Sequence, residues 1–309
     1  MILCAGEALI DMLPRKTEKG EAAFAPYPGG SVLNTAVALS RLGVATQFFT
    51  GLSTDLFGER LANVLTANGV GHGLAARSDR PTTLAFVTLT DGQASYAFYD
   101  ENTAGRMLTE ADLPAIPEDC AACFFGGISL AVEPCAEAYA TLAARAAGAG
   151  RVVMLDPNIR PSFIADEERF RARMDRMLSH ADIVKLSDED LRWLMGDRSF
   201  VELTSELQKK GPKLVLVTQG AAGVTAFGPG GEVHVDATMV EVVDTVGAGD
   251  TFNAGLLAGL SDAGLLDKAA LAEGLPEDGL RAALELGVKA AAVTVTRAGA
   301  NPPRREEIA

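Results

Sequence analysis

The stretch Asp244-Thr-Val-Gly-Ala-Gly-Asp-Thr-Phe-Asn253 decides how the rest of the chain is interpreted. A β-like run at residues 240–243 precedes it, and the small and apolar residues at 252–260 predict a buried helix after it. Gly247 and Gly249 lack a Cβ atom, so their backbone can approach a ligand closely. Successive free amides at the start of a helix, with the macrodipole behind them, predict a site for anionic oxygen.

Asp250 falls in the first turn of that predicted helix. We expect the positive end of the helix dipole to hold its carboxylate ionised, so that it can accept a proton from a hydroxyl. An anion cradle beside a base suits transfer of a phosphoryl group to an alcohol. The alternative is a Gly-rich strand-to-helix turn whose Asp only caps the helix. The stretch lacks the Gly-x-x-x-x-Gly-Lys pattern, so we do not expect a P-loop.

Composition narrows the class of protein. The chain has 309 residues, enough for a large core, and a net charge of −14 from 27 basic and 41 acidic residues. This acidic balance, without a basic cluster, argues against a nucleic-acid or anionic-membrane partner. The start carries Glu7 and Asp11 and no basic segment, and no stretch has the pattern of a membrane span. Four cysteines among apolar neighbours, including Cys120-Ala-Ala-Cys123, indicate buried thiols in a reducing cytoplasm.

Strand and helix patterns alternate from residue 120 onward, which predicts a mostly parallel sheet with helices on both faces. Two segments break this rhythm. Residues 12–28 are polar and irregular, and the alternating runs 82–90 and 94–99 flank Asp91-Gly92, a strong hairpin signal. We expect one domain over residues 1–309, with a small β lid built from about 12–28 and 82–106.

Polar residues follow the predicted strands at several places. Residues 2–10 predict a buried strand ending at Asp11, and ligands of open α/β sheets bind at such ends. Gly29-Gly30 then opens a helix to about Leu42, with Ser31 as the expected N-cap. Asn34, one turn in, can both donate to and accept from a sugar hydroxyl. A surface Asp and a simple Gly-Gly turn are the alternatives.

The loop Asp156-Pro-Asn-Ile-Arg160 ends another strand. Asn158 offers amide hydrogen bonds and Arg160 a planar fork for oxygen atoms, although a stiff loop with a surface Arg is the alternative. The strand at 214–218 runs into a Gly-rich turn, which would place Thr218 and Gly220 beside the anion cradle.

Residues 244–253 resemble the C-terminal signature of the ribokinase/PfkB family of carbohydrate kinases, and Gly29-Gly30 with Asn34 resembles its N-terminal signature. The resemblance covers essentially the whole chain. It implies a ribokinase-like three-layer α/β/α sandwich with a mostly parallel central sheet and a small β-sheet lid. It also implies that Asp250 is the catalytic base, that the amides of Gly247, Ala248 and Gly249 form the anion hole, and that Asp11, Gly29, Gly30 and Asn34 hold the sugar.

The same resemblance extends to the nucleotide side. Residues 214–223 resemble the family's nucleotide-phosphate loop, which implies ATP contacts by Thr218, Gly220 and Gly223. The family resemblance also implies ATP contacts by Lys185, Ser187, Gly247 and Gly249. The family's Asn-x-x-Glu motif organises magnesium, and this chain departs from it with Ser187 and Asp190. Asp190 can still hold a metal-bound water, with Glu189 as the competing candidate; an acidic helix N-terminus is the alternative explanation. Asp244 is a candidate for a monovalent cation such as K⁺, as in relatives.

Residues 6–14 and 156–160 look most like bacterial fructokinases, which implies phosphorylation of D-fructose to fructose 6-phosphate by ATP, with Asn158 and Arg160 facing the substrate or the transferring phosphate. The alternatives are a 2-keto-3-deoxygluconate kinase, in which Arg160 or Arg106 would meet a carboxylate, and another sugar kinase such as ribokinase. A non-catalytic sugar-sensing module on the same fold is a further alternative.

Aromatic residues in the second predicted lid segment supply a candidate for contact with the sugar. Among Tyr96, Phe98 and Tyr99 we select Phe98 for a ring laid on the apolar face of the sugar. Packing within the lid, or a homodimer contact through it, is the alternative for each ring.

Overall fold

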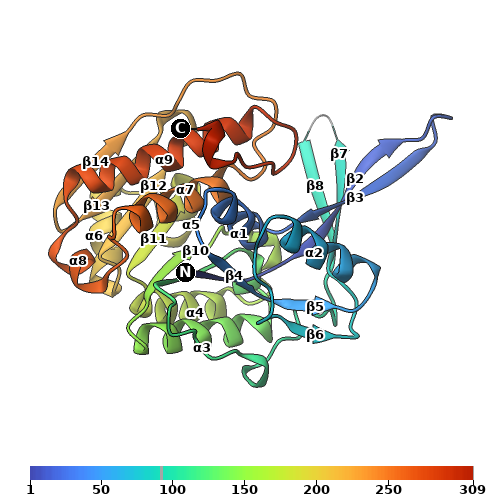
Figure 1. Ribbon diagram of the computed structural model, residues 1–309, viewed down its shortest axis with the longest axis horizontal. Helices are drawn as coiled ribbons and strands as arrows, with labels where there is room; N and C mark the ends of the chain where they lie inside the picture. Colours follow the sequence, from blue (N-terminus) through green and yellow to red (C-terminus); the bar gives the residue numbers. More distant parts are fainter. Residues whose placement is uncertain (91–92, 309) are drawn as a thin grey trace.

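The computed structural model describes residues 1–90 and 93–308, and its largest sheet has eight strands in the order β14-β13-β12-β11-β10-β9-β1-β4 (Figure 1). The strands from β4 to β12 in this order run parallel, and β13 and β14 are antiparallel additions at one edge. The strands are β1 (Ile2–Ala5), β4 (Thr46–Phe49), β9 (Ala122–Gly126), β10 (Val152–Asp156), β11 (Ile183–Ser187), β12 (Leu214–Thr218), β13 (Val224–Gly228) and β14 (Gly231–Val235).

Helices cover both faces of this sheet because its strands are apolar on both faces. In β1, Ile2 and Cys4 pack into one core and Leu3 and Ala5 into the other, as the period of two requires. The first core is covered by α1 (Ser31–Arg41), α2 (Leu56–Ala67), α7 (Ala248–Asp262), α8 (Lys268–Glu273) and α9 (Glu277–Val295). The second is covered by α3 (Cys135–Gly148), α4 (Glu167–His180), α5 (Asp188–Met195) and α6 (Phe200–Lys210).

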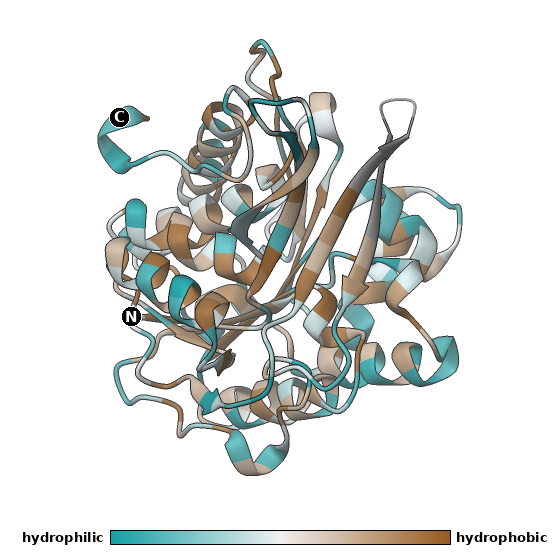
Figure 2. Cartoon of the chain, turned by 90° about the vertical axis from the view of Figure 1, so that its right-hand side faces the viewer, coloured by the Kyte–Doolittle hydropathy of each residue, from teal (hydrophilic) through white to brown (hydrophobic). Residues whose placement is uncertain are grey.

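The predicted three-layer α/β/α sandwich with a mostly parallel sheet is therefore confirmed. Figure 2 shows polar residues concentrated on the outward surfaces of the helices. All four cysteines are buried free thiols, as expected. No helix in the described part of the chain is both long and apolar enough to cross a membrane.

A separate four-stranded sheet projects from one side of the sandwich, in the order β3-β2-β7-β8 (Figure 1). Its strands are β2 (Leu9–Lys16), β3 (Ala22–Gly29), β7 (Leu84–Thr90) and β8 (Gln93–Tyr99). β7 and β8 are antiparallel, as the hairpin pattern predicted, and the turn residues Asp91 and Gly92 lie outside the described residues. A short parallel pair, β5 (Gly51–Ser53) and β6 (Ala76–Ser78), completes the strands.

The expectation of one buried strand over residues 2–10 is wrong. The chain breaks after Ala5 and enters the small sheet at Leu9, so Asp11 belongs to β2 and not to the end of a core strand. Residues 12–28, expected to be irregular, fall mostly in β2 and β3. They looked irregular because Pro26 and Pro28 lie in β3, and an edge strand can accommodate residues without an N–H group.

Two further local expectations are wrong. Residues 240–243 form an exposed loop rather than a strand. Helix α1 has Gly30 as its N-cap, and Ser31 is its first residue. The Ser31 hydroxyl instead donates to Glu7 Oε1 at 2.6 Å, and the Ser31 N–H donates to the same oxygen at 2.9 Å. The carboxylate of a residue outside the helix thus accepts a hydrogen bond from a free N–H group at the start of this helix.

Candidate active site

The predicted site residues meet at one edge of the main sheet. β1, β9, β10, β11 and β12 run parallel, so their carboxyl ends share that edge. β4 lies on one side of β1, and β9 with the later strands lies on the other side. The strand order therefore reverses between β1 and β9, which creates a topological switch point. Ligands of open α/β sheets bind at such points. The N-termini of α1 and α7 also reach this region, since Asn34 and Asp250 are in contact.

The N-terminus of α7 has the backbone of an anion-binding nest. Gly247 is left-handed, with φ of 80°, and the helix begins at Ala248. A Cβ atom on Gly247 would lie 2.8 Å from that of Ala300, so glycine is required for both conformation and space. The Ala248 N–H donates to Thr245 O at 3.3 Å, whereas within the described chain the amides of Gly247 and Gly249 have no acceptor. Two free amides and the helix dipole therefore remain for an anionic oxygen.

Asp250 joins the two halves of the site. Its side chain is buried, with the residue 8% exposed, and Asn34 Nδ2 donates to its Oδ2 at 2.8 Å. Thr35 Oγ1 on the same helix donates to the Asp250 carbonyl oxygen at 3.2 Å. These bonds hold α1 against the first turn of α7. The two sequence signatures, at residues 29–34 and 244–253, are thus in direct contact.

Burial raises the pKa of Asp250 from its ordinary value of 3.8 to about 7. The hydrogen bond from Asn34 and the charge of Lys185 lower this pKa, and the charges of Asp156 and Glu7 raise it. Burial thus acts against the ionised form that the helix dipole was expected to favour. A carboxyl group with a pKa near 7 is a stronger base than an exposed one.

This pKa predicts the pH dependence of turnover. We expect kcat/KM to fall about tenfold per pH unit below about pH 7, because only the ionised Asp250 can accept a proton. Titration of a nucleotide substrate would give a similar limb, so the Asp156→Asn variant serves as the control. Removing a neighbouring negative charge lowers the pKa of Asp250 and should move the limb to lower pH. Rate profiles from pH 5 to 9 with an unmoved limb would contradict this assignment.

A buried ion pair lies behind the anion nest. Lys185 Nζ in β11 donates to Asp156 Oδ2 at the end of β10 at 3.0 Å, and Asn253 Nδ2 in α7 donates to the same oxygen at 2.7 Å. A Cβ atom on Gly249 would lie 3.3 Å from Lys185 Nζ, so the ammonium group is adjacent to the nest. Sequence reasoning assigned no role to Asp156 or Asn253. The lysine inside the apolar run at residues 183–186 could have indicated a buried acidic partner, since buried lysines are almost always paired.

Glu7 is the other residue that sequence reasoning missed. Its carboxylate binds the first residue of α1 and accepts the Ser129 N–H at 3.3 Å, which links β1, α1 and the segment after β9. Glycine is favoured at position 127 because its φ is 71°, and a Cβ atom there would also lie 2.1 Å from Glu7 Oε1. Glu7 therefore fixes the mouth of α1, where Gly30 and Asn34 lie.

The loop after β10 meets the small sheet across the site. Asn158 has a positive φ of 43°, and its N–H donates to Asp156 Oδ1 at 3.2 Å. The Arg160 side chain is exposed and donates to the Ile159 carbonyl oxygen. Phe98 in β8 contacts Phe163 edge-to-face, with ring centroids 4.2 Å apart. Of the two competing candidates, Tyr99 is exposed and contacts Phe86, and the side chain of Tyr96 lies outside the described residues.

Asp11 faces the same side of the small sheet as Phe98, since both residues are paired with Ala85. Burial raises the pKa of Asp11 to about 6. A Cβ atom on Gly29, which pairs with Leu9 in β2, would lie 2.1 Å from Asp11 Oδ2, so the glycine makes room for this carboxyl group. Asp11 thus contributes a polar group to the lid, although not from a core strand.

The residues proposed for metal ions lie at separate places. Ser187 caps α5, and its Oγ accepts the Asp190 N–H at 3.0 Å. Burial raises the pKa of Asp190, and the charge of Asp156 raises it further, whereas Glu189 is exposed. Asp244 accepts the N–H groups of Val246 and Gly299. In the described part of the chain no three His, Cys, Asp or Glu side chains form a metal-ligand cluster.

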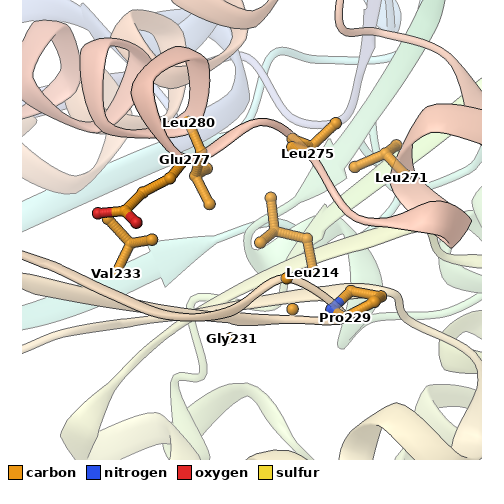
Figure 3. A pocket seen from close by; sticks show the side chains of 10 residues that line it. Leu214, Pro229, Gly231, Val233, Leu271, Leu275, Glu277 and Leu280 are labelled. Carbon is orange, nitrogen blue, oxygen red and sulfur yellow. The ribbon is translucent and has the colours of Figure 1, made fainter.

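A cavity of about 380 Å³ lies beside the anion nest. It brings together Thr218, Gly220 and Gly223 with Ala248 and Gly249, as predicted for a nucleotide site, whereas Lys185 and Ser187 do not line it. A smaller cavity of about 50 Å³ lies between the β13–β14 turn and helices α8 and α9 (Figure 3). It is mostly apolar, with Glu277 at its rim, and contains none of the predicted site residues.

Comparisons with known proteins give the family. The chain is 53% identical to a fructokinase from Rhizobium leguminosarum bv. trifolii over 283 residues, which cover 91% of this chain and 86% of that relative. A Xylella fastidiosa fructokinase with bound ATP superposes with a TM-score of 0.88 and 32% identity, covering 97% of this chain and 93% of that one. A Vibrio cholerae O395 fructokinase double mutant with fructose, ADP and potassium ion bound superposes with a TM-score of 0.85 and 27% identity, covering 97% and 93%.

A family model described as pfkB family carbohydrate kinase matches residues 1–307. The match spans both signatures, the small sheet and the cavity beside α7. The chain therefore belongs to the pfkB family of carbohydrate kinases.

Proposed function

We propose that this protein is an ATP-dependent fructokinase that phosphorylates the primary hydroxyl of D-fructose at position 6. The observation that carries the chemistry is Asp250, a buried carboxyl group with a pKa of about 7, beside two free amides at the N-terminus of α7. The similarity to the Rhizobium fructokinase supports fructose as the sugar.

In the proposed reaction the sugar hydroxyl oxygen attacks the γ-phosphorus of ATP, and a carboxylate oxygen of Asp250 accepts the hydroxyl proton. The bond between the γ-phosphorus and the bridging oxygen breaks, and ADP leaves. The amides of Gly247 and Gly249 would stabilise the negative charge of the transferring group, because they are already oriented and cost no reorganisation. The Ala248 amide could join them by giving up its long turn hydrogen bond to Thr245. Lys185 would add a fixed positive charge behind this nest.

The sugar would lie between the small sheet and the mouth of α1. Asp11, Gly29 and Gly30, Asn34 and Asn158 supply polar groups on this side, and Phe98 supplies an aromatic face from the lid. Arg160 is exposed at the edge of the site and therefore free to approach the sugar or the transferring phosphate.

ATP would occupy the cavity of about 380 Å³, with its phosphates at Thr218, Gly220, Gly223 and the α7 nest. Mg²⁺ fits a site in which the phosphates supply most oxygen ligands, with Asp190 holding a coordinated water. Asp190 is buried near Asp156, which favours a nearby cation. We also propose K⁺ near Asp244. Removing Mg²⁺ with a chelator should abolish turnover, and replacing K⁺ by a larger cation should lower it.

An assay of purified protein with Mg-ATP and single sugars tests the proposed function. We expect phosphorylated product from fructose, identified by mass spectrometry, with kcat/KM above those for 2-keto-3-deoxygluconate, ribose and adenosine. A higher kcat/KM for 2-keto-3-deoxygluconate, with this preference lost in the Arg160→Gln variant, would instead identify a 2-keto-3-deoxygluconate kinase. Tight fructose binding without turnover of any sugar would favour the sugar-sensing module.

The lid offers a surface for a second subunit. Phe24 and Tyr99 are 43% and 64% exposed, and both contact Phe86 on one face of the small sheet. Exposed apolar surface of this kind favours association, so we propose a homodimer through the lid. Sedimentation velocity on wild type and on a Phe24→Ser/Tyr99→Ser variant would test it, since a wild-type monomer would refute the proposal.

The proposed use of ATP and the free thiols favour the cytoplasm as the compartment of this protein.

A further inference from the structure

Most of the side chains that line the large cavity are apolar. They come mainly from β13, α7, α9 and the loop before α7. They include Val224, Ala237, Met239, Val240, Val242, Phe252, Val288, Ala291, Ala292 and Val295. Within the described chain, no amide, carboxylate, ammonium or guanidinium side chain lines the cavity.

Helix α9 forms one wall without free polar groups. Val288, Ala291, Ala292 and Val295 face the cavity at the spacing of one helix face. The backbone groups of the helix interior are bonded within the helix. The Val295 carbonyl oxygen, near the end of the helix, already accepts the N–H groups of Val243 and Asp244 at 2.8 and 3.2 Å. This wall can therefore contact a base only through its apolar surface.

The loop between β14 and α7 supplies the facing wall. Met239 is 84% exposed and Val242 is 58% exposed, although both side chains line the cavity. Large apolar side chains that remain exposed on a loop beside a cavity indicate a partner that covers them. The bonds from Val243 and Asp244 to Val295 fix the end of this loop on α9, so its apolar side chains stay near the cavity. A flat aromatic base fits between these two walls.

The remaining polar side chains do not distinguish one purine from another. Hydroxyl groups of Thr218, Thr238 and Thr245 line the cavity. A hydroxyl both donates and accepts, so it can pair equally well with the 6-amino group of adenine and the 6-oxo group of hypoxanthine. We propose that this kinase does not read the 6-position of the purine, and that it uses ITP as a phosphoryl donor nearly as well as ATP. This proposal rests on the proposed sugar-kinase function.

A hydrogen-bonding pocket discriminates between similar substrates much more strongly than an apolar pocket does. A site built to hydrogen-bond a substrate group rejects the analogue that lacks it by about 10⁴-fold or more, whereas an apolar pocket discriminates by roughly 10–200-fold. ITP and ATP have nearly the same size and shape, so contact area should not separate them. We therefore expect their kcat/KM values to lie within about thirtyfold of each other.

The experiment measures fructose phosphate formation with ATP and with ITP at saturating fructose. The sugar phosphate is quantified directly, so that an ADP-specific coupling enzyme does not bias the result. An ATP preference above about thirtyfold would overturn the proposal and would indicate that backbone groups of the loop read the base. Absence of turnover with ATP itself would refute the proposed function instead, so the two failures are distinguishable.

Two variants make the test sharper. Thr238→Val removes one hydroxyl at constant shape on an exposed residue, and it should leave the ratio of ATP to ITP efficiencies unchanged. Met239→Ser removes apolar contact and should raise KM for both nucleotides by the same factor, whereas Val201→Ser, at an exposed apolar residue that does not line the cavity, should not. A tenfold or greater change of the ratio in either variant would contradict apolar recognition of the base.

Discussion

Asp250→Asn is expected to lower kcat by about 10²–10⁴-fold, the usual contribution of a general base, while the Kd for fructose changes only a few-fold. The amide is similar in shape to the carboxyl group, and its oxygen can still accept the hydrogen bond from Asn34 Nδ2. It cannot accept a proton at neutral pH, so only the transition state loses stabilisation. Steady-state kinetics and calorimetric titration with fructose separate the two quantities. Turnover at the wild-type rate would remove Asp250 from its proposed role.

The same variant should be more stable than wild type at alkaline pH. The native carboxyl group has a pKa of about 7 against an ordinary value of 3.8, so the native state binds more protons than the unfolded state between these values. Stability therefore falls as pH rises through this window, and the loss persists above it. Asp250→Asn removes this term, and its Tm should exceed that of wild type more at pH 8 than at pH 5. Asp79→Asn, at an exposed carboxylate, should show no such difference.

Lys185→Met is expected to reduce both stability and turnover. Lys185 is 6% exposed and its partner Asp156 is 3% exposed, so the substitution leaves a buried carboxylate without its cation. Loss of one partner of a buried pair costs about 3–5 kcal/mol in the free energy of unfolding. Because the ammonium group lies next to the anion nest, we also expect kcat to fall by roughly 10²-fold or more. Urea unfolding and initial rates measure the two effects.

Two controls separate charge loss from general damage. Lys210→Met breaks an exposed pair with Asp175 and should cost at most about 1 kcal/mol. The double variant Lys185→Met/Asp156→Asn removes both charges, so it should recover most of the lost stability but not the lost turnover. Recovery of turnover in the double variant would mean that Lys185 only neutralises Asp156 and does not act on the phosphoryl group.

The positions of the candidate residues could be predicted from local patterns, whereas their partners could not. The glycines at 247 and 249 and the helix after them predicted a nest with Asp250 in its first turn, because turn geometry and helix onset depend on neighbouring residues. The pairing of Asp250 with Asn34 depends on helices that are far apart in the sequence. The family resemblance suggested that these residues share a site, and the structure shows them in contact.

Two of the errors, at residues 2–10 and at Ser31, have the same origin. Residues 2–10 have the composition of one buried strand, but the chain bends at Gly6, where the carboxylate of the next residue, Glu7, binds the start of α1 and the Ser129 amide. Ser31 has the chemistry of an N-cap, yet Glu7 already supplies the acceptor for its N–H group. In both cases a distant carboxylate replaced the local interaction that the sequence pattern favours.

The sequence by itself determined the layered α/β/α order, the separate lid hairpin and the Gly-rich turn that carries Asp250, since hydrophobic period and glycine requirements act over a few residues. Only the tertiary structure decided the raised pKa of Asp250 and the contacts among Asp156, Lys185 and Asn253 behind the nest. Burial and proximity depend on how distant segments pack, and the pKa of a carboxyl group depends on both.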